Sequence, residues 1–293
     1  MNYKKTLENS IKRKSKFIDD VIHYHKNIPL FSWIEISPID ACNRKCIFCP
    51  KSDSKIAPDT FNIMENKYIE KLANELKEMN YKGTVVFAGY GEPMLDKKIF
   101  EKISILSGIC NVEITTNGDA LTKTNIIKLV QSGINKIVVS LYDGPEQIDK
   151  FNKLFISSGI KKDKYILRDR WYKEEDGWGL MVTNRAGTLK LDNKNLPQKK
   201  NMSCYYTHYS MMIDWNGNCY LCTQDWQRKI VSGNIFKQHI FEIWNSEILK
   251  KYRINLGAGN RTENPCVNCN AYGLMHGSSH FEAWKKYYSK SKI

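Results

Sequence analysis

Three cysteines, Cys42, Cys46 and Cys49, stand close together in a Cys-x3-Cys-x2-Cys arrangement. This spacing puts three thiols on one loop, where they can converge on a single metal centre. An iron–sulfur cluster suits such a site, because cysteine thiolates are its usual ligands. Three thiolates leave one iron of a four-iron cubane without a protein ligand, and an open iron can bind a small molecule and take part in chemistry. A zinc loop is the alternative interpretation.

A second group of cysteines lies in the last third of the chain, where five of the nine occur. Two pairs, Cys219-x2-Cys222 and Cys266-x2-Cys269, together have the form of a four-cysteine zinc site. The 43 residues between the pairs exceed the usual gap of a zinc ribbon, and that assignment leaves Cys204 without a role. The sequence therefore predicts a second metal centre that holds either zinc or iron.

The elements that must position these cysteines alternate between strands and helices. Short, nearly continuous apolar runs are typical of strands buried on both faces, and they occupy residues 31–36, 84–88, 112–115, 136–141 and 165–167. Between them, apolar residues recur at helical spacing in residues 69–79, 99–106 and 148–154. Gly133 and Gly159 stand where helices are expected to end. This alternation predicts an α/β fold with a parallel sheet, either open and doubly wound or a full or partial barrel.

The composition changes after about residue 170, where the strand–helix alternation breaks and Trp, Gly, Asn and Lys become frequent. We therefore divide the chain into a basic N-terminal helical segment (1–29), an α/β unit (30–180), a smaller metal-organised unit (181–275) and a C-terminal helix (276–293).

The segment from Cys42 to Cys49, CNRKCIFC, resembles the CxxxCxxC loop of radical S-adenosylmethionine (SAM) enzymes. In that family the three cysteines hold a [4Fe-4S] cluster whose open iron binds SAM. Reductive cleavage then yields a 5′-deoxyadenosyl radical that abstracts a hydrogen atom from the substrate. The resemblance implies that Phe48 lies beside the adenine and that residues 30–180 form a partial (β/α)6 TIM barrel.

The sequence from Gly89 to Pro93, GYGEP, resembles the family's Gly-Gly-Glu-Pro motif, whose backbone and acid receive the SAM amino group. Tyr90 departs from the motif, since it stands where the first glycine is expected. Polar residues at later strand ends complete the implied SAM site, and Arg168 could pair with the SAM carboxylate. The implied cofactor-binding residues are Phe48, Gly89, Gly91, Glu92, Thr115, Asn117, Ser140 and Arg168.

The late cysteines resemble the opening of the SPASM/twitch pattern, in which a small hairpin and helix carry an auxiliary [4Fe-4S] cluster. Since no cysteine follows Cys269, the resemblance implies a twitch-type domain with one such cluster. A closed cluster requires four thiolates. The implied ligands are Cys204, Cys222, Cys266 and Cys269. Cys219 is left over, either packed in the hairpin or placed as a catalytic hydrogen donor.

A closed auxiliary cluster cannot bind SAM, so it supports the structure, binds the substrate or transfers electrons, and electron transfer gives the sharpest mechanism. Hydrogen abstraction from a carbinol carbon followed by loss of an electron and a proton gives a ketone, which makes the protein a dehydrogenase. Four residues between the units are candidate substrate contacts: Arg168, Arg170, Trp171 and Arg185. Arginine binds phosphate or carboxylate through paired hydrogen bonds, which favours an anionic sugar or sugar nucleotide. Ordinary ion pairing with neighbouring acids explains the same arginines.

The overall charge and hydropathy limit the partners. Lys and Arg outnumber Asp and Glu by 45 to 31, a net charge of +14 at pH 7, but the lysines are spread along the chain and indicate a solubilising surface. No apolar run approaches the roughly 20 residues of a membrane span, and we find no secretory signal. We expect a cytoplasmic protein that receives electrons from an external donor such as flavodoxin or ferredoxin.

Other functions stay open at this point. A SPASM-type peptide maturase or a radical epimerase would use the same clusters, and an epimerase needs a hydrogen donor such as Cys219. A zinc-organised, basic nucleic-acid-binding protein would contain zinc and no iron. We favour an iron-containing enzyme, so nucleic acid is not an expected partner.

Overall fold

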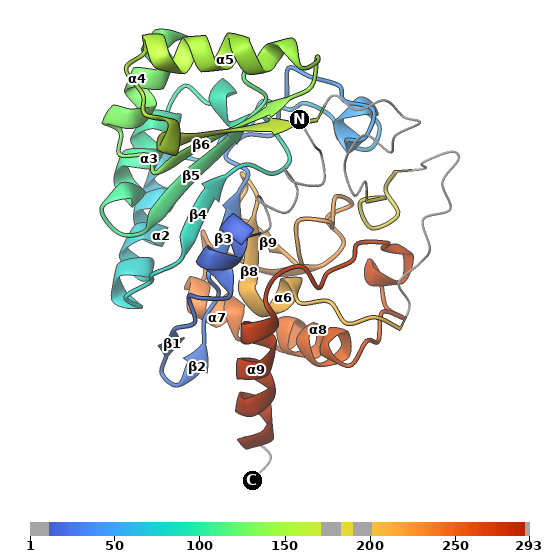
Figure 1. Cartoon of the computed structure of the whole chain (residues 1–293). Coiled ribbons are helices and arrows are strands. Elements are labelled where there is room, and N and C mark those ends of the chain that lie inside the picture. Colours follow the sequence, from blue (N-terminus) through green and yellow to red (C-terminus); the bar gives the residue numbers. More distant parts are fainter. Residues whose placement is uncertain (1–11, 171–182, 190–200, 291–293) are drawn as a thin grey trace.

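The computed structural model describes residues 12–170, 183–189 and 201–290 (Figure 1). Its centre is an eight-stranded sheet in the order β10-β9-β8-β3-β4-β5-β6-β7. The strands of the α/β unit are β3 (Trp33–Ile36), β4 (Thr84–Phe87), β5 (Asn111–Thr116), β6 (Lys136–Leu141) and β7 (Tyr165–Asp169). The others are β8 (Ser210–Ile213), β9 (Asn218–Tyr220) and β10 (Val231–Asn234).

Strands β8, β3, β4, β5, β6 and β7 run parallel, whereas β9 and β10 are antiparallel additions at one edge. In the described residues β7 pairs with β6 alone, so the sheet stays open, as a partial barrel does. The predicted α/β class and partial barrel are confirmed. The parallel strands are buried on both faces, as β3 shows: Ile34 and Ile36 join the main core on one face, while Trp33 packs with Ile18 on the other.

The division at residues 180/181 does not separate two independent cores. β8, from the unit expected to be separate, pairs with β3 from Trp33↔Ser210 to Ile36↔Ile213 and supplies the sixth parallel strand. The main core likewise contains residues of both units, such as Ile34 and Trp244. Pairing with β8 satisfies the backbone groups that β3 would otherwise expose at a sheet edge. Sequence spacing carries no information on such long-range pairing.

Four helices cover the outer face of the parallel strands (Figure 1): α2 (Asn66–Glu78), α3 (Ile99–Ser107), α4 (Lys123–Gln131) and α5 (Glu146–Ser157). For α4 the sequence analysis named only the end of the helix, at Gly133, and no helical spacing. Gly133 and Gly159 follow the last turns of α4 and α5 with φ of +86° and +73°, which confirms them as helix ends.

The ends of the chain differ in part from expectation. Residues 12–18 are helical, but β1 (Tyr24–His25) and β2 (Ile28–Pro29) form a hairpin, so the helical prediction is wrong there. The turn needs Lys26 and Asn27 at positive φ, which a helix does not allow. The later helices are α6 (Tyr206–Tyr209), α7 (Ile240–Trp244), α8 (Glu247–Gly257) and α9 (Ser278–Lys290). Short 3₁₀ turns cover Pro50–Ser52, Pro93–Leu95, Lys162–Lys164 and Cys266–Asn268. Among the described helices none has the length and apolarity of a membrane span.

Candidate active site

The first cysteine loop follows β3 at the carboxyl edge of the parallel strands. Cys42, Cys46 and Cys49 are all partly exposed. Burial raises the pKa of each thiol, that of Cys46 to about 12, and the charge of one thiolate raises the pKa of its neighbours. Cys49 therefore lies near enough to Cys42 and Cys46 to act on both electrostatically. Because a metal displaces thiol protons, such a group gives up protons when iron binds.

Charged side chains hold this loop over the ends of β5 and β6. The Arg44 guanidinium donates to both carboxylate oxygens of Asp119 (2.6 and 2.7 Å) and of Asp143 (2.6 and 2.8 Å). Asn43 donates to Asp119 (2.7 Å) and accepts from the Asn117 amide (2.8 Å). These contacts fix the loop between the first two cysteines.

A buried ion-pair network ties the far end of the loop to the C-terminal unit. The Lys51 ammonium lies 3.1 Å from Asp40 and 3.0 Å from Asp59. Arg228 reaches Asp40 at 3.3 Å and Asp214 at 2.8 Å. The loop thus contacts both parts of the chain.

Glu92 is the buried carboxylate of the site, only 4% exposed. It accepts hydrogen bonds from Thr116 Oγ1 (2.6 Å) and from the backbone N–H groups of Asn117 (2.8 Å) and Met94 (3.0 Å). Burial raises the pKa of Glu92 to about 7, although these three hydrogen bonds act to lower the pKa. The acid can therefore carry either charge state near neutral pH. Thr116 was not predicted; the sequence analysis named its neighbour Thr115.

The glycines of the same motif are needed for close backbone approach. A Cβ on Gly91 would lie 2.2 Å from the Ile39 carbonyl oxygen and 2.7 Å from that of Ala41. Gly89 has a φ of +97° and lies against Met212. The motif loop therefore runs directly behind the start of the cysteine loop.

Tyr90, the departure from the family motif, has a structural role. Its ring centroid lies 4.6 Å from that of Trp226 in an edge-to-face contact. Its hydroxyl donates to the Asp225 carbonyl and its N–H to Ser37 Oγ, each at 3.1 Å. Tyr90 thus packs the motif loop against the C-terminal unit, a function that glycine could not supply.

The remaining residues proposed to contact SAM lie along the same edge. The Phe48 ring centroid is 5.7 Å from that of Tyr142, which follows β6. Tyr142 hydrogen-bonds Ser140, which is buried in β6, and Thr115 is half-buried in β5. The structure therefore brings the cysteine loop, Phe48, Glu92, Asn117 and Ser140 to one end of the sheet.

A charged cluster fills the inner face of the sheet, and the sequence analysis missed it. Arg13 donates to buried Glu113 of β5 at 2.6 Å. The Lys14 ammonium lies 4.4 Å from the centroid of the Trp33 ring, and burial lowers its pKa to about 8. Burial raises the pKa of Glu35 on β3, opposed mainly by Lys14. The sequence did contain a signal for this cluster, because Glu35 is an acid inside the otherwise apolar strand Trp33–Ile36.

Two predicted substrate arginines border this cluster. Burial lowers the pKa of Arg168 on β7, and its Nε, like that of Arg185, has no hydrogen-bond acceptor among the described residues. Arg185 acts electrostatically on Glu35 and on thiols of both cysteine groups. Arg170 continues β7, with its N–H bonded to the Leu141 carbonyl at 2.7 Å. Trp171 lies outside the described residues.

The second cysteine group also gathers in space. Burial raises the pKa of all four thiols, that of Cys204 to about 11, and the four act on one another electrostatically. Cys269 Sγ accepts from the Ala271 N–H at 3.4 Å. The group comprises Cys204, Cys222, Cys266 and Cys269, the four residues that the resemblance implies as ligands.

Cys219 is separate from this group. It is fully buried in β9, where Lys71 and Glu75 of α2 act on it electrostatically and its thiol contacts the Gly217 carbonyl at 3.9 Å. This position on the helix-covered face favours the packing role over that of a hydrogen donor.

The donor geometry tests the type of metal centre. No three thiol, imidazole or carboxylate groups of the described residues converge closely enough to hold a single metal ion. A zinc site needs four ligands about 2.0–2.3 Å from one point, whereas a cubane spreads its thiolates because each binds a different iron. The described residues therefore show no preformed site for a single zinc ion.

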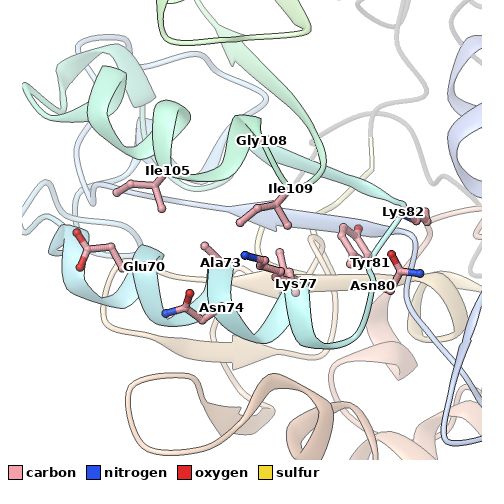
Figure 2. Close-up of a pocket in the computed structure, with 11 residues that line it drawn as sticks. Glu70, Ala73, Asn74, Lys77, Asn80, Tyr81, Lys82, Ile105, Gly108 and Ile109 are labelled. Atoms are coloured by element: carbon pink, nitrogen blue, oxygen red, sulfur yellow. The ribbon is translucent and has the colours of Figure 1, made fainter.

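A hollow on the outer surface lies apart from these residues. Figure 2 shows it between α2 and α3, with Asn74 and Lys77 on one side and Ile105 and Ile109 on the other. No cysteine lines it, so we do not assign it to the site.

Comparisons with known proteins agree with this geometry. A model of the radical SAM superfamily matches residues 36–163, and that of the SPASM iron–sulfur cluster-binding domain matches residues 204–270. The chain is 32% identical over 248 residues to the S-adenosyl-L-methionine-dependent 2-deoxy-scyllo-inosamine dehydrogenase of Niallia circulans, which covers 82% of this chain and 93% of that protein. A GTP 3′,8-cyclase of Desulforamulus reducens is 29% identical over 123 residues, 41% of this chain and 36% of the cyclase.

Solved structures of known proteins are also similar to this chain. The crystal structure of BtrN in complex with AdoMet and 2-DOIA matches with a TM-score of 0.72 at 29% identity, covering 85% of this chain and 97% of that one. The structure of anSMEcpe with bound AdoMet matches with a TM-score of 0.52 at 16% identity over 89% and 97% of the two chains, which shows a shared fold.

Proposed function

The chain belongs to the radical SAM superfamily and carries a SPASM-type auxiliary cluster domain, and we propose that it oxidises a secondary alcohol of an anionic, sugar-like metabolite to a ketone. The observation that carries this proposal is the pair of cysteine sites, one with three thiols and one with four. Glu92 acts electrostatically on Cys42 of the first site. Arg185 acts on a thiol of each site and on Glu35 of the charged cluster.

The residues of the first site suit SAM. The three thiols of the first loop would hold the open cluster, and the Glu92 carboxylate would accept hydrogen bonds from the SAM amino group. Gly91 lets the loop that carries Glu92 lie against the Ile39 and Ala41 carbonyls, directly before the first cysteine. When bound, the clusters and SAM would supply a hydrogen-abstracting radical and an electron acceptor. The chain's own side chains would bind the substrate and accept its proton.

The hydroxyl proton of the substrate needs an acceptor inside the barrel. Glu35 and Lys14 have pKa values displaced by burial towards the neutral range, that of Lys14 to about 8. We assign the proton to Nζ of Lys14 or to a carboxylate oxygen of Glu35. Together with one hydrogen atom and one electron, this accounts for the two electrons and two protons lost by the alcohol.

Charge inside the barrel favours an anionic substrate. Glu113 is paired with Arg13, and Glu35 faces Lys14. Arg168 and Arg185 add two further cations, each with an Nε that lacks an acceptor among the described groups. A phosphate or carboxylate could take hydrogen bonds from both guanidinium groups.

Two further expectations belong to this proposal. An external carrier such as flavodoxin or ferredoxin would supply the reducing electron, and the protein would work in the cytoplasm. The nine free cysteines suit a reducing compartment.

The test uses anaerobically reconstituted protein with SAM, a reductant and a panel of phosphorylated cyclitols, sugar nucleotides, aminocyclitols and peptides. Substrates carry deuterium at the carbinol carbon. We expect one deuterated 5′-deoxyadenosine for each ketone formed, and an anionic substrate among the active ones. Crosslinked peptide without ketone, or an epimer that gains solvent hydrogen, would overturn the dehydrogenase proposal.

Cys219→Ala provides a matched variant. The dehydrogenase proposal expects full ketone formation, because Cys219 is buried against α2. An epimerase that used the Cys219 thiol as its hydrogen donor would form no epimer in this variant.

A further inference from the structure

Arg261 is a buried arginine beside the second cysteine site, and only 2% of it is exposed. All of its hydrogen bonds go to backbone carbonyls: Nε to Met202 (2.7 Å), Nη1 to Ala271 (2.7 Å), and Nη2 to Ser203 (2.9 Å) and Tyr272 (3.2 Å). It forms an ion pair with no carboxylate of the described residues. These contacts orient the guanidinium but leave its charge uncompensated.

A buried charge without a partner is costly, so its counter-charge must be sought nearby. Arg253 shows one solution in the same region. Its guanidinium carbon lies 3.9 and 4.0 Å from the ring centroids of Trp244 and Trp284, whose faces stabilise a cation. The described residues place no such ring over Arg261.

What Arg261 does have nearby are thiols. The carbonyls that hold its guanidinium belong to Met202 and Ser203, directly before Cys204, and to Ala271 and Tyr272, shortly after Cys269. A Cβ on Gly273 would lie 2.6 Å from Cys204 Sγ and 3.0 Å from Arg261 Nη2, so glycine at this position lets the backbone pass close to both. The guanidinium and the cysteines therefore form one compact unit.

We propose that Arg261 is the counter-charge of the auxiliary cluster and raises its reduction potential, so that the cluster accepts an electron more readily. A cubane with four thiolates is anionic, and reduction adds one negative charge. A fixed cation beside it stabilises the reduced form more than the oxidised form. This inference rests on the proposed function only in giving the auxiliary cluster the role of electron acceptor.

Asp225 is the opposing charge in the same site. It is fully buried, its carboxylate accepts from the N–H groups of Lys229 (3.1 Å) and Ile230 (2.9 Å), and its own N–H donates to the Cys222 carbonyl at 3.1 Å. Arg261 thus places a positive charge beside the cysteines, and Asp225 places a negative one. Neutralising the two residues should therefore move the potential in opposite directions.

The test is a redox titration of the reconstituted holoenzyme, followed by electron paramagnetic resonance without substrate. The auxiliary signal is the one that added SAM does not change. Arg261→Gln should shift the reduction equilibrium at least tenfold towards the oxidised form, which is 59 mV for a one-electron couple. Arg261→Lys should shift it less, and Asp225→Asn should shift it the other way.

Arg253→Gln is the matched control, because it removes a buried arginine that acts on none of these thiols. It should leave the potential unchanged. An Arg261→Gln protein with a full auxiliary cluster and an unchanged potential would overturn the inference. If Arg261→Gln fails to assemble the cluster, the Asp225→Asn protein becomes the deciding test. An unchanged or lower reduction potential in that protein would also overturn the inference. Because no substrate is present, failure of the dehydrogenase proposal would not affect these results.

Discussion

The two cysteine sites differ in how their surroundings treat charge. Around the first, charged side chains are paired with one another, as Arg44 is with Asp119 and Asp143. Around the second, Arg261 and Asp225 are both buried, and Arg261 forms an ion pair with no carboxylate in the described part of the chain. On our proposals, the first environment would position a charged small molecule at the open iron of its cluster, and the second would favour added negative charge on a closed cluster.

Paired glycine substitutions should separate the two sites most strongly. Gly91→Ala places a Cβ 2.2 Å from a backbone oxygen, and Gly273→Ala places one 2.6 Å from Cys204 Sγ. Each clash costs about 1–3 kcal/mol of folding free energy. We expect Gly91→Ala to lose SAM binding and keep the auxiliary iron, and Gly273→Ala to do the reverse. Iron content and equilibrium dialysis with SAM measure both.

Gly108→Ala is the control for this pair, since no atom lies within 4 Å of its added Cβ. Its iron content and SAM binding should match those of the parent protein. Loss of iron from both sites in either clashing variant would show that the sites are not independent.

Glu92→Gln tests the charge of the first site alone. The variant keeps the size of the side chain but removes the carboxylate that would bind the SAM amino group. Hydrogen bonds to charged groups contribute about 1.5–3 kcal/mol, so SAM should bind roughly 10- to 150-fold more weakly. Auxiliary iron content should not change. Unaltered SAM affinity would remove Glu92 from the cofactor site.

The pH dependence of SAM binding sharpens the same point. The pKa of Glu92 is raised to about 7, so the acid is protonated below that pH and anionic above it. SAM affinity should fall by about tenfold per pH unit below 7 and level off above it. Dissociation constants at pH 6, 7 and 8 measure this, and Glu92→Gln should flatten the profile. A profile that rises towards low pH contradicts the assignment.

Arg44→Met should have the smallest effect. Its partners Asp119 and Asp143 are 35% and 53% exposed, so solvent screens the pairs and their loss costs about 1 kcal/mol at most. We expect a melting temperature lower by about 2–4 °C in low salt and a smaller difference in high salt. Lys45, itself 49% exposed, pairs with Asp59 alone among the described carboxylates, so Lys45→Met should shift the melting temperature less. If the Arg44→Met protein loses the same stability at every salt concentration, the Arg44 side chain stabilises the protein through packing and not through its ion pairs.

The sequence analysis identified the features that depend on local spacing. The strands, the cysteine loop and the motif acid follow from short-range pattern, and the structure places Cys42, Glu92 and Asn117 at one end of the sheet. Glu92 was found because its neighbours form a recognisable motif.

What it missed depends on contacts between distant segments. The pairing of β8 with β3 joins residues about 177 positions apart, as in Trp33↔Ser210. Lys14 reaches the barrel interior from a terminal segment whose composition indicated only a basic surface. Tyr90 acquires its role from Trp226, and Arg261 from the distant Cys204. No periodicity marks such partners.

The division of labour between the cysteine sites is tested most directly by following 5′-deoxyadenosine and ketone in Cys46→Ala and Cys222→Ala proteins of known iron content. We predict that Cys46→Ala retains auxiliary iron but cleaves no SAM, and that Cys222→Ala cleaves SAM without forming ketone. SAM cleavage at the normal rate in Cys46→Ala would contradict the account.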